Sequence, residues 1–353
     1  MYKVVISGYY GYDNLGDEAV LQGIISSLRR EAEEEIEFTV FSASPRETEE
    51  RYGVRATGRF NLFSLLSGLI SCDLFISGGG SLLQDTTGWK TVPYYLILIF
   101  FAHLLGVKTA VYAQGVGPLE GRVARFLVGW VLKRVDLVTV RDQGSRELLA
   151  ELGISRERIE VTVDPVFALQ PVCRKREGEQ KPLIGVAVRP WGDNNYLSEL
   201  AGALDSFLAM TGGHCLLVPL QLEKDLAICR KLEELMEYDA EIYEKQLTPD
   251  EAMAFFARFD FFIGVRLHSL IFSALQGVPF FALSYDPKVE AFVGELGFEN
   301  WLSLPECVTT LLKEKLQVVW EKRVEIEDRL NEVRPDCRRE AARNACRVLK
   351  LLN

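Results

Sequence analysis

The chain has 353 residues, 48% of them hydrophobic, which is enough for two domains with cores of their own. Its formal net charge of -10 disfavours nucleic acid as a partner. Only three histidines are present, and the seven cysteines form no CxxC pair. The composition therefore favours buried, reduced thiols over disulfides, and predicts no metal site.

Six strand-like runs in the first half of the chain alternate with stretches of helical length. These runs, rich in Val, Ile and Phe, cover residues 3–8, 35–42, 73–79, 108–115, 135–140 and 159–164. Near-continuous apolar runs separated by helices are typical of a parallel sheet that is covered on both faces. We therefore expect residues 1–170 to form an N-terminal Rossmann-like domain.

Two apolar stretches of this half raise the question of membrane contact. Residues 91–106 carry an uncharged run shorter than the ~18 to 20 residues of a membrane span, so we predict a buried helix. Residues 59–70 could touch lipid, although a buried amphipathic helix is the favoured interpretation. Because Met1 leads directly into a strand-like run, we expect no signal peptide and a cytoplasmic protein, with contact at the inner membrane face left open.

The second half of the chain repeats the same pattern. A polar segment flanked by prolines, residues 171–182, is the predicted linker. Further strand-like runs follow at 183–189, 214–221, 240–245, 259–266 and 278–285, again with helices between them. Residues 183–330 are therefore predicted to form a C-terminal Rossmann-like domain, and residues 331–353 a helical segment with a break at Pro335. The predicted fold class is α/β, with two doubly wound units and a helical C-terminus.

The loop after the first strand-like run, within residues 7–23, contains the first candidate binding residues. Open parallel sheets bind ligands beyond the carboxyl ends of their strands, and the amides at a helix start favour anions or polar oxygens. The spacing is not that of a dinucleotide fingerprint, and the polar residues Asn14, Asp17 and Glu18 are unsuited to a pyrophosphate. Helix capping by Asn14 or Asp17 is the structural alternative. Capping needs one such residue rather than three, so a functional role is favoured.

Glycine-rich loops follow the third and fourth runs, at residues 77–85 and 114–119. Gly79 and Gly80 belong to three consecutive glycines, which let a ligand or a neighbouring loop approach the backbone closely, and Gln114 lies beside them at the end of its run. A plain strand-to-helix turn explains either loop equally well when it is considered alone.

Five basic side chains lie at or just beyond the ends of other strand-like runs: Arg141, Arg189, Arg266, His268 and Lys288. Each arginine taken alone could pair with a carboxylate, as Arg141 could with Asp142. Their equivalent positions in an acidic protein favour a small, highly charged anion bound in an interdomain cleft. Arg suits such an anion because it binds carboxylate and phosphate in a bidentate way.

These motifs together resemble the polysaccharide pyruvyl transferases. The resemblance rests on GYYGYDNLGDEAVL, FISGGGSLLQD, YAQGVGP, VTVRDQGS, VDPVF and GVRLHSLIFSALQGVPFFALSYDPKVEAF, which occur in this order. No single motif is specific, whereas the combination is, and the likeness is greatest to members that modify secondary cell-wall polymers. The resemblance implies a GT-B-like fold, in which two Rossmann-type domains face a central cleft.

The same resemblance implies a donor, an acceptor and residues for each. The donor is phosphoenolpyruvate, and the product is a pyruvate ketal at the 4- and 6-hydroxyls of a sugar. We expect no further cofactor and no metal, because arginines can neutralise the leaving phosphate. The implied acceptor is a terminal β-linked N-acetylmannosamine on a lipid-linked precursor at the cytoplasmic membrane face. The implied donor residues, in the C-terminal domain and at the end of the fifth run, are Arg141, Arg266, His268 and Lys288, with Arg189 as a supporting residue. The expected acceptor-binding residues of the N-terminal domain are Asn14, Glu18, Gly79, Gly80 and Gln114.

Two residues are assigned chemical roles. His268 has an ordinary pKa near ~6.5, which suits proton delivery to the methylene carbon of phosphoenolpyruvate, although it could instead serve only as a phosphate ligand. Asp17 is the candidate base for the attacking sugar hydroxyl.

Two other functions fit the same fold. The first is a nucleotide-sugar glycosyltransferase or epimerase that uses Glu290 to hold the ribose, for which binding of a nucleoside diphosphate would be diagnostic. The second is a non-catalytic sensor of sugar phosphates, which would close on its ligand without turnover.

Overall fold

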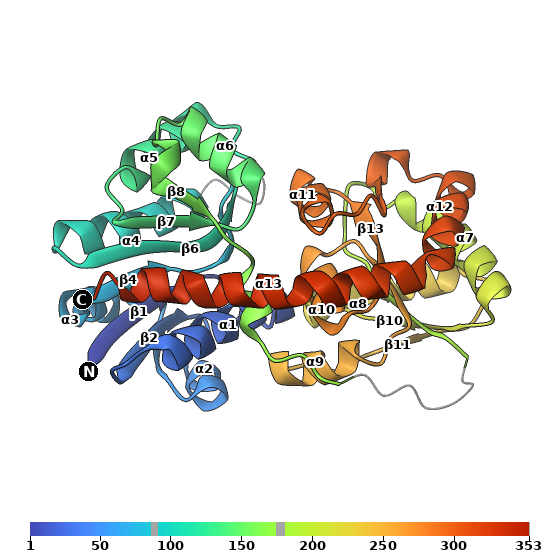
Figure 1. Cartoon of the computed structure of the whole chain (residues 1–353), viewed down its shortest axis with the longest axis horizontal. Coiled ribbons are helices and arrows are strands. Elements are labelled where there is room, and N and C mark those ends of the chain that lie inside the picture. Colours follow the sequence, from blue (N-terminus) through green and yellow to red (C-terminus); the bar gives the residue numbers. More distant parts are fainter. Residues whose placement is uncertain (86–90, 174–180, 353) are drawn as a thin grey trace. The chain divides into compact units, whose positions relative to one another are not determined.

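The computed structural model describes residues 1–85, 91–173 and 181–352, which fall into two compact units (Figure 1). Unit 1 comprises Met1–Leu169 together with Cys337–Asn353, and unit 2 comprises Gln170–Asp336. Residues 174–180, the larger part of the predicted linker, lie outside the described residues.

Unit 1 is built on a sheet in which the described strands pair in parallel. Its strands are β1 (Tyr2–Ser7), β2 (Ile36–Ser42), β3 (Arg55–Gly58), β4 (Leu74–Ser77), β5 (Gly80–Leu83), β6 (Lys108–Val116), β7 (Leu137–Val140) and β8 (Ile159–Val161). Their order is β3-β2-β1-β4-β6-β7-β8, with β5 paired to β6 off this path. All six strands predicted for this half are present, whereas β3 and β5 were not predicted.

Helices cover both faces of this sheet. Successive strand residues point to opposite sides, and the strands are apolar on both sides, so both faces must be buried. The helices are α1 (Leu15–Glu31), α2 (Pro45–Tyr52), α3 (Leu62–Ser71), α4 (Thr91–Leu104), α5 (Arg122–Leu132) and α6 (Gln143–Glu151), with the short 3-10 helices η1 (Arg156–Arg158) and η2 (Pro165–Ala168). On β6, Val111 packs into one core cluster with buried residues of α3, α4 and α5. The next residue, Tyr112, faces the other way, and its hydroxyl lies 3.2 Å from that of Ser27 on α1.

Unit 2 repeats the arrangement with a second parallel sheet. Its strands are β9 (Leu183–Ala187), β10 (His214–Leu217), β11 (Ala240–Ile242), β12 (Phe261–Gly264), β13 (Phe280–Ser284) and β14 (Trp301–Ser303), in the order β11-β10-β9-β12-β13-β14. The five predicted strands are confirmed, and β14 was not predicted. Both sheets start from a central strand, β1 or β9, and change direction beside it, which is the doubly wound Rossmann order.

The helices of unit 2 are also divided between two faces. They are α7 (Tyr196–Thr211), α8 (Leu222–Leu235), α9 (Pro249–Phe256), α10 (Leu267–Gln276), α11 (Pro287–Glu295) and α12 (Thr309–Glu321), with η3 (Leu304–Glu306) and the first part of α13 (Arg323–Leu349). The ring of Phe261 packs on Phe207 of α7 and Trp320 of α12. The adjacent Phe262 packs on Phe256 of α9, so neighbouring residues of β12 serve opposite faces.

The predicted break of the C-terminal helix at Pro335 is wrong. α13 continues through Pro335, with its first part assigned to unit 2 and its last part to unit 1. Contacts on both sides of the proline hold the helix: Arg334 donates to the carbonyl of Leu275, and Arg347 forms an ion pair with Glu160 at 2.6 Å. These contacts offset the loss of one backbone hydrogen bond at Pro335.

The prediction of buried apolar helices is only half right. Residues 59–70 and 91–106 do contain helices, α3 and α4, but α3 buries only Leu65 and Leu69, and Phe63 is 88% exposed. Among the described residues, no helix has both the length and the apolar character needed to cross a membrane.

None of the seven cysteines, all of which lie in the described residues, forms a disulfide, and four of them are buried: Cys72, Cys215, Cys229 and Cys307. Cys173 is exposed, contrary to the prediction of burial.

Candidate functional site

The loop between β1 and α1 places three predicted acceptor-side residues at the carboxyl edge of the unit 1 sheet. Asn14 is the N-cap of α1, where its side chain accepts a hydrogen bond from the amide of Gly16 and donates one to Asp17. Asn14 therefore caps α1, which is the structural alternative given above, and it also contacts Asp17. The side chain of Asp17 is half-buried.

Glu18 is held inside unit 1 rather than at its surface. One carboxylate oxygen accepts from the amide of Gly11 at 2.7 Å, and the other accepts from the hydroxyl of Tyr52 at 2.6 Å. Burial raises the pKa of Glu18 above its ordinary value, although these two hydrogen bonds oppose the rise. This geometry fixes the loop that carries Asn14, and direct contact of Glu18 with a sugar stays a prediction.

The consecutive glycines bring a second strand end against this loop. Gly80 has φ +89, and a Cβ there would stand 2.9 Å from the Oδ1 atom of Asp17. A Cβ on Gly79 would stand 2.9 Å from Val20, so Gly79 permits the close packing of α1. Gln114 is fully buried and donates to the Ser77 hydroxyl and the Gly78 carbonyl, each at 2.7 Å. Unit 1 therefore brings Asp17 and Gly80 into contact and places Gln114 at the same edge.

Arg141 at the end of β7 is buried and paired. It forms an ion pair with Asp164 at 2.7 Å and donates to the Ser81 hydroxyl at 3.1 Å. Burial, the largest single effect, lowers the pKa of Arg141, but the carboxylates of Asp164, Asp142 and Asp17 together outweigh it and raise the pKa above its ordinary value. The predicted alternative partner, Asp142, instead caps α6 by accepting from Ser145.

An arginine that was not predicted, Arg59, also reaches the loop after β1. It is buried, donates to the carbonyl of Gly8 at 3.3 Å, and donates to the hydroxyl of Tyr95 at 3.2 Å. Its guanidinium lies over the rings of Tyr12, at 5.3 Å, and Tyr94, at 4.7 Å. A charged residue opening the apolar stretch 59–70 was the signal that could have identified it.

In unit 2, Arg266 occupies the turn between β12 and α10. It forms an ion pair with Asp225 of α8, whose side chain is fully buried, while the Arg266 side chain keeps 14% of its surface exposed. Within the described residues, the Nε atom of Arg266 has no hydrogen-bond partner. Burial raises the pKa of the neighbouring Cys229 thiol to about 12, and the charge of Asp225 adds to the rise.

The other predicted donor residues of unit 2 lie at the ends of adjacent strands. Arg189 follows β9 and stacks on the ring of Tyr285 after β13, at 4.3 Å from its centre. His268 and Lys288 are the second residues of α10 and α11. Because β9, β12 and β13 are neighbours in the sheet, these cations share one carboxyl edge, where two helix N-termini add partial positive charge. The meeting of Arg141 with these unit 2 residues stays a prediction.

Asp164 and Asp225, the buried carboxylates that pair with Arg141 and Arg266, were not singled out from the sequence. Asp164 stands before a proline at the end of a strand-like run, and Asp225 lies in the first turn of α8, positions where acidic residues ordinarily serve as caps. The signal available for each was its position at the same sheet edge as an unexplained arginine.

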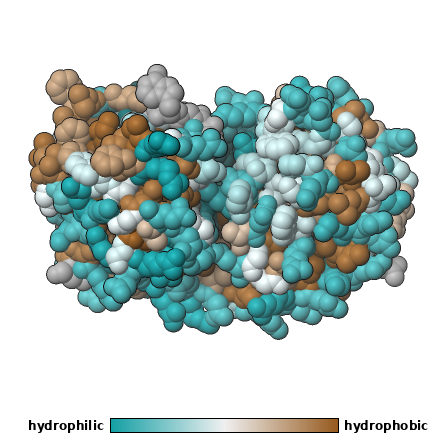
Figure 2. Space-filling model, turned by 90° about the horizontal axis from the view of Figure 1, so that it is seen from above, coloured by the Kyte–Doolittle hydropathy of each residue, from teal (hydrophilic) through white to brown (hydrophobic). Residues whose placement is uncertain are grey.

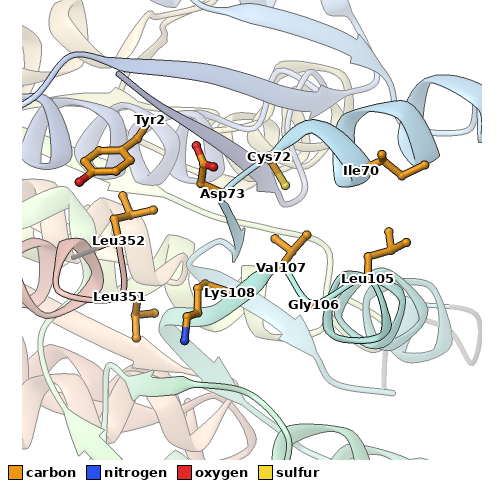
Figure 3. Close-up of a pocket in the computed structure, with 10 residues that line it drawn as sticks. All are labelled: Tyr2, Ile70, Cys72, Asp73, Leu105, Gly106, Val107, Lys108, Leu351 and Leu352. Atoms are coloured by element: carbon orange, nitrogen blue, oxygen red, sulfur yellow. The ribbon is translucent and has the colours of Figure 1, made fainter.

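Within the described ranges, no group of three His, Cys, Asp or Glu side chains is arranged to hold a metal ion. A pocket of about 350 Å³ lies at the opposite, amino edge of the unit 1 sheet, where Tyr2, Asp73 and Lys108 line it together with Leu351 and Leu352 (Figure 3). Ligands of open parallel sheets bind at the carboxyl edge, so this pocket is separate from the candidate site.

A comparison with known protein families gives one match. The model of the family described as polysaccharide pyruvyl transferase matches residues 14–287. This range contains Asn14, Asp17 and Glu18 and the named residues of the unit 2 edge except Lys288. The chain belongs to the polysaccharide pyruvyl transferase family. Membership supports an enzyme that transfers pyruvyl groups to polysaccharides. No protein sequence in the curated set matches the chain.

Solved structures share the fold at low sequence identity. Anabaena Alr3699/HepE in complex with UDP-glucose has a TM-score of 0.69 and 12% identity, over 100% of this chain and 99% of that one. The UDP-GlcNAc 2-epimerase of Neisseria meningitidis, bound to UDP-GlcNAc, has a TM-score of 0.64 and 13% identity, over 98% and 99%. The UDP-GlcNAc 2-epimerase of Methanocaldococcus jannaschii has a TM-score of 0.60 and 12% identity, over 91% and 92%. These likenesses confirm the predicted GT-B-like α/β fold of two Rossmann-type units.

Proposed function

We propose that this enzyme transfers the pyruvyl group of phosphoenolpyruvate to a terminal sugar of a lipid-linked cell-wall glycopolymer precursor, as the CsaB-type members of its family do. The product is a ketal across the 4- and 6-hydroxyls of a β-linked N-acetylmannosamine. The observation that carries the proposal is the gathering of Arg189, Arg266, His268 and Lys288 at one sheet edge of an acidic protein.

The charges of this edge suit the donor. Phosphoenolpyruvate carries a phosphate and a carboxylate on neighbouring atoms, so separate cations can fix its orientation as well as its position. Asp225 holds one side of the Arg266 guanidinium, while 14% of the surface of this side chain stays exposed. Its buried Nε is a further donor that has no hydrogen-bond partner among the described residues. The amides at the start of α10 point in the direction that favours phosphate.

The reaction balances without an oxidant or a metal. A proton added to the methylene carbon makes the neighbouring carbon electrophilic, and a sugar hydroxyl adds there and loses its proton. The bond from that carbon to the phosphate oxygen breaks, phosphate leaves, and the second hydroxyl adds and loses its proton to complete the ketal. We assign the first proton to His268 and the acceptance of a hydroxyl proton to Asp17.

Asp17 suits this role by its position. It is half-buried, contacts Asn14, and lies against the backbone of Gly80, where a ligand can approach without a side chain in the way. Asn14 and Gln114 supply amide groups of the kind that orient sugar hydroxyls.

Transfer is tested by incubating the enzyme with phosphoenolpyruvate and a synthetic acceptor that ends in β-N-acetylmannosamine. We expect equal amounts of phosphate and of ketal-bearing acceptor, measured by phosphate release and mass spectrometry. Turnover of a UDP-sugar in place of phosphoenolpyruvate would favour the epimerase or glycosyltransferase alternative. In that case Glu290, which now accepts from the Ser284 hydroxyl at 2.9 Å, becomes the residue to examine.

The variant His268→Asn distinguishes a proton donor from a residue that only binds phosphate. If His268 delivers the proton, turnover falls by about 10²- to 10⁴-fold while phosphoenolpyruvate still binds. Loss of binding would instead make His268 a phosphate ligand and contradict the assignment of the proton.

A further inference from the structure

Three helices of unit 1 expose large apolar side chains to solvent. We name this set the apolar face; its residues, from α3, α4, α5 and the positions flanking them, are Phe60, Leu62, Phe63, Ile70, Ile97, Phe101, Leu104, Leu105, Val123, Phe126 and Trp130. Phe63 and Phe126 are 88% and 69% exposed. Hydrophobic surface gathers at the left of Figure 2, on unit 1.

The apolar face is continuous from one helix to the next. α4 packs against both α3 and α5. The ring of Phe60 lies 5.9 Å from that of Tyr94 at the start of α4, and the ring of Phe100 lies 5.0 Å from that of Trp130 on α5. A continuous exposed apolar surface of this kind marks an interaction site rather than the scattered single residues of an ordinary surface.

The helices of the apolar face carry basic side chains and no acidic ones, although exposed Asp73, Glu120, Asp136 and Glu151 lie at its border. Residues 59–71, 91–108 and 121–135 contain no Asp or Glu, although the chain has 50 of them. Arg122, Lys133 and Arg134 are exposed on or beside α5, and Arg134 lies over the ring of Trp130 at 4.0 Å. A helix with apolar residues on one side and arginine or lysine beside them is typical of a surface that lies in the headgroup region of an anionic membrane.

We propose that the apolar face docks on a membrane surface rich in anionic phospholipids. Phe63 and Phe126 enter the boundary between headgroups and acyl chains, and Arg122, Lys133 and Arg134 contact lipid phosphates. A second copy of the chain fits less well, because two such faces would bring the same positive charges together.

This docking surface adjoins the candidate acceptor residues within unit 1. Arg59 contacts the ring of Phe60 at 5.3 Å on one side, and the ring of Tyr12 at 5.3 Å and the carbonyl of Gly8 on the other. The apolar face is thereby joined to the loop that carries Asn14 and Asp17. The link to a lipid-borne acceptor rests on the proposed function, whereas membrane binding itself does not.

The test is co-sedimentation of the full chain with vesicles of phosphatidylcholine alone or mixed with phosphatidylglycerol. We expect binding only to the mixed vesicles, reduced about tenfold or more in a Phe63→Ser, Phe126→Ser double variant and in an Arg122→Glu, Lys133→Glu variant. A Val308→Ser, Val324→Ser variant is the matched control, because these residues are 51% and 56% exposed on unit 2. It should bind like the wild type.

Three outcomes would overturn the proposal: wild-type protein that stays in the supernatant, equal binding by the double variant, or a wild-type dimer that the double variant makes monomeric. Phosphoenolpyruvate binding and turnover of a short water-soluble acceptor are measured on the same proteins and should be unchanged in the Phe63, Phe126 variant. Failure of docking with turnover intact thus contradicts only the docking surface, and vesicle binding without turnover contradicts only the proposed function.

Discussion

The two sheets share their strand order but carry opposite chemistry at their carboxyl edges. The edge of unit 1 has glycines, amides and the carboxylate of Asp17, and its arginine, Arg141, is buried against Asp164. The edge of unit 2 has a concentration of cations, and its Arg266 is paired with Asp225 yet remains partly exposed. The two sheets thus have equivalent edges, and the residues at the strand ends make the edge of unit 2 more cationic than that of unit 1.

The largest expected effect is a difference in stability between variants of the Arg141–Asp164 and Arg266–Asp225 ion pairs. Asp164→Ala leaves Arg141 buried without its ion-pair partner and should cost about 3–5 kcal/mol of unfolding free energy. Asp225→Ala should cost less, because Arg266 can turn toward water. Urea denaturation measures both, with Glu244→Ala, which removes the exposed partner of Arg230, as a control that should change little. An equal cost for the two variants would contradict the distinction drawn between a buried and an accessible arginine.

A smaller effect is expected at Gly80. Gly80→Ala forces an L side chain into a left-handed conformation, at about 1–2 kcal/mol, and sets a Cβ against Asp17. Gly53→Ala is the matched control, since Gly53 has φ +59 and no atom within 4 Å of the added Cβ. Both variants should lose similar stability, but only Gly80→Ala should lower kcat. Unchanged turnover in Gly80→Ala would contradict the proposed role of Asp17 in the reaction.

The smallest effect is a pH dependence that arises from Glu18. Burial raises the pKa of Glu18 in the folded state, so the folded protein binds this proton more tightly than the unfolded chain does. Its contribution to stability is complete below the unfolded pKa of about 4.3 and is lost as the pH rises through the raised folded value. In urea titrations across this range, Glu18→Gln should flatten that part of the profile, and Glu47→Gln, an exposed residue of α2, should not. An unchanged profile in Glu18→Gln would show that the burial of this carboxylate does not govern the dependence.

The sequence predicts the regular part of the fold because the central strands are continuous apolar runs. The strands that were missed, β3, β5 and β14, are three or four residues long, and β5 starts inside a run of glycines that resembles a loop. Pro335 shows the opposite error, since a strong local signal is overridden by contacts on both sides of it. In all four cases, the three short strands and Pro335, contacts with residues distant in the sequence determine the structure. A local sequence pattern does not reveal such contacts.

The candidate site divides in a similar way. Arg141, Arg266 and His268 stand out in the sequence because charges at the ends of apolar runs are unusual. Their carboxylate partners do not, because Asp164 and Asp225 occupy positions where acidic residues are common. The exposure of Phe63 and Phe126 was also not predicted, since an apolar helix that faces solvent has the same composition as one that faces a core.

The central claim is that the cationic edge of unit 2 binds phosphoenolpyruvate, and isothermal calorimetry with this donor tests it most directly. The wild type should bind it saturably, Arg266→Ala should lose about 100-fold or more in affinity, and Arg230→Ala, at an exposed ion pair of the same unit, should bind like the wild type. Equal binding by Arg266→Ala, or binding of UDP and not of phosphoenolpyruvate by the wild type, would contradict the account.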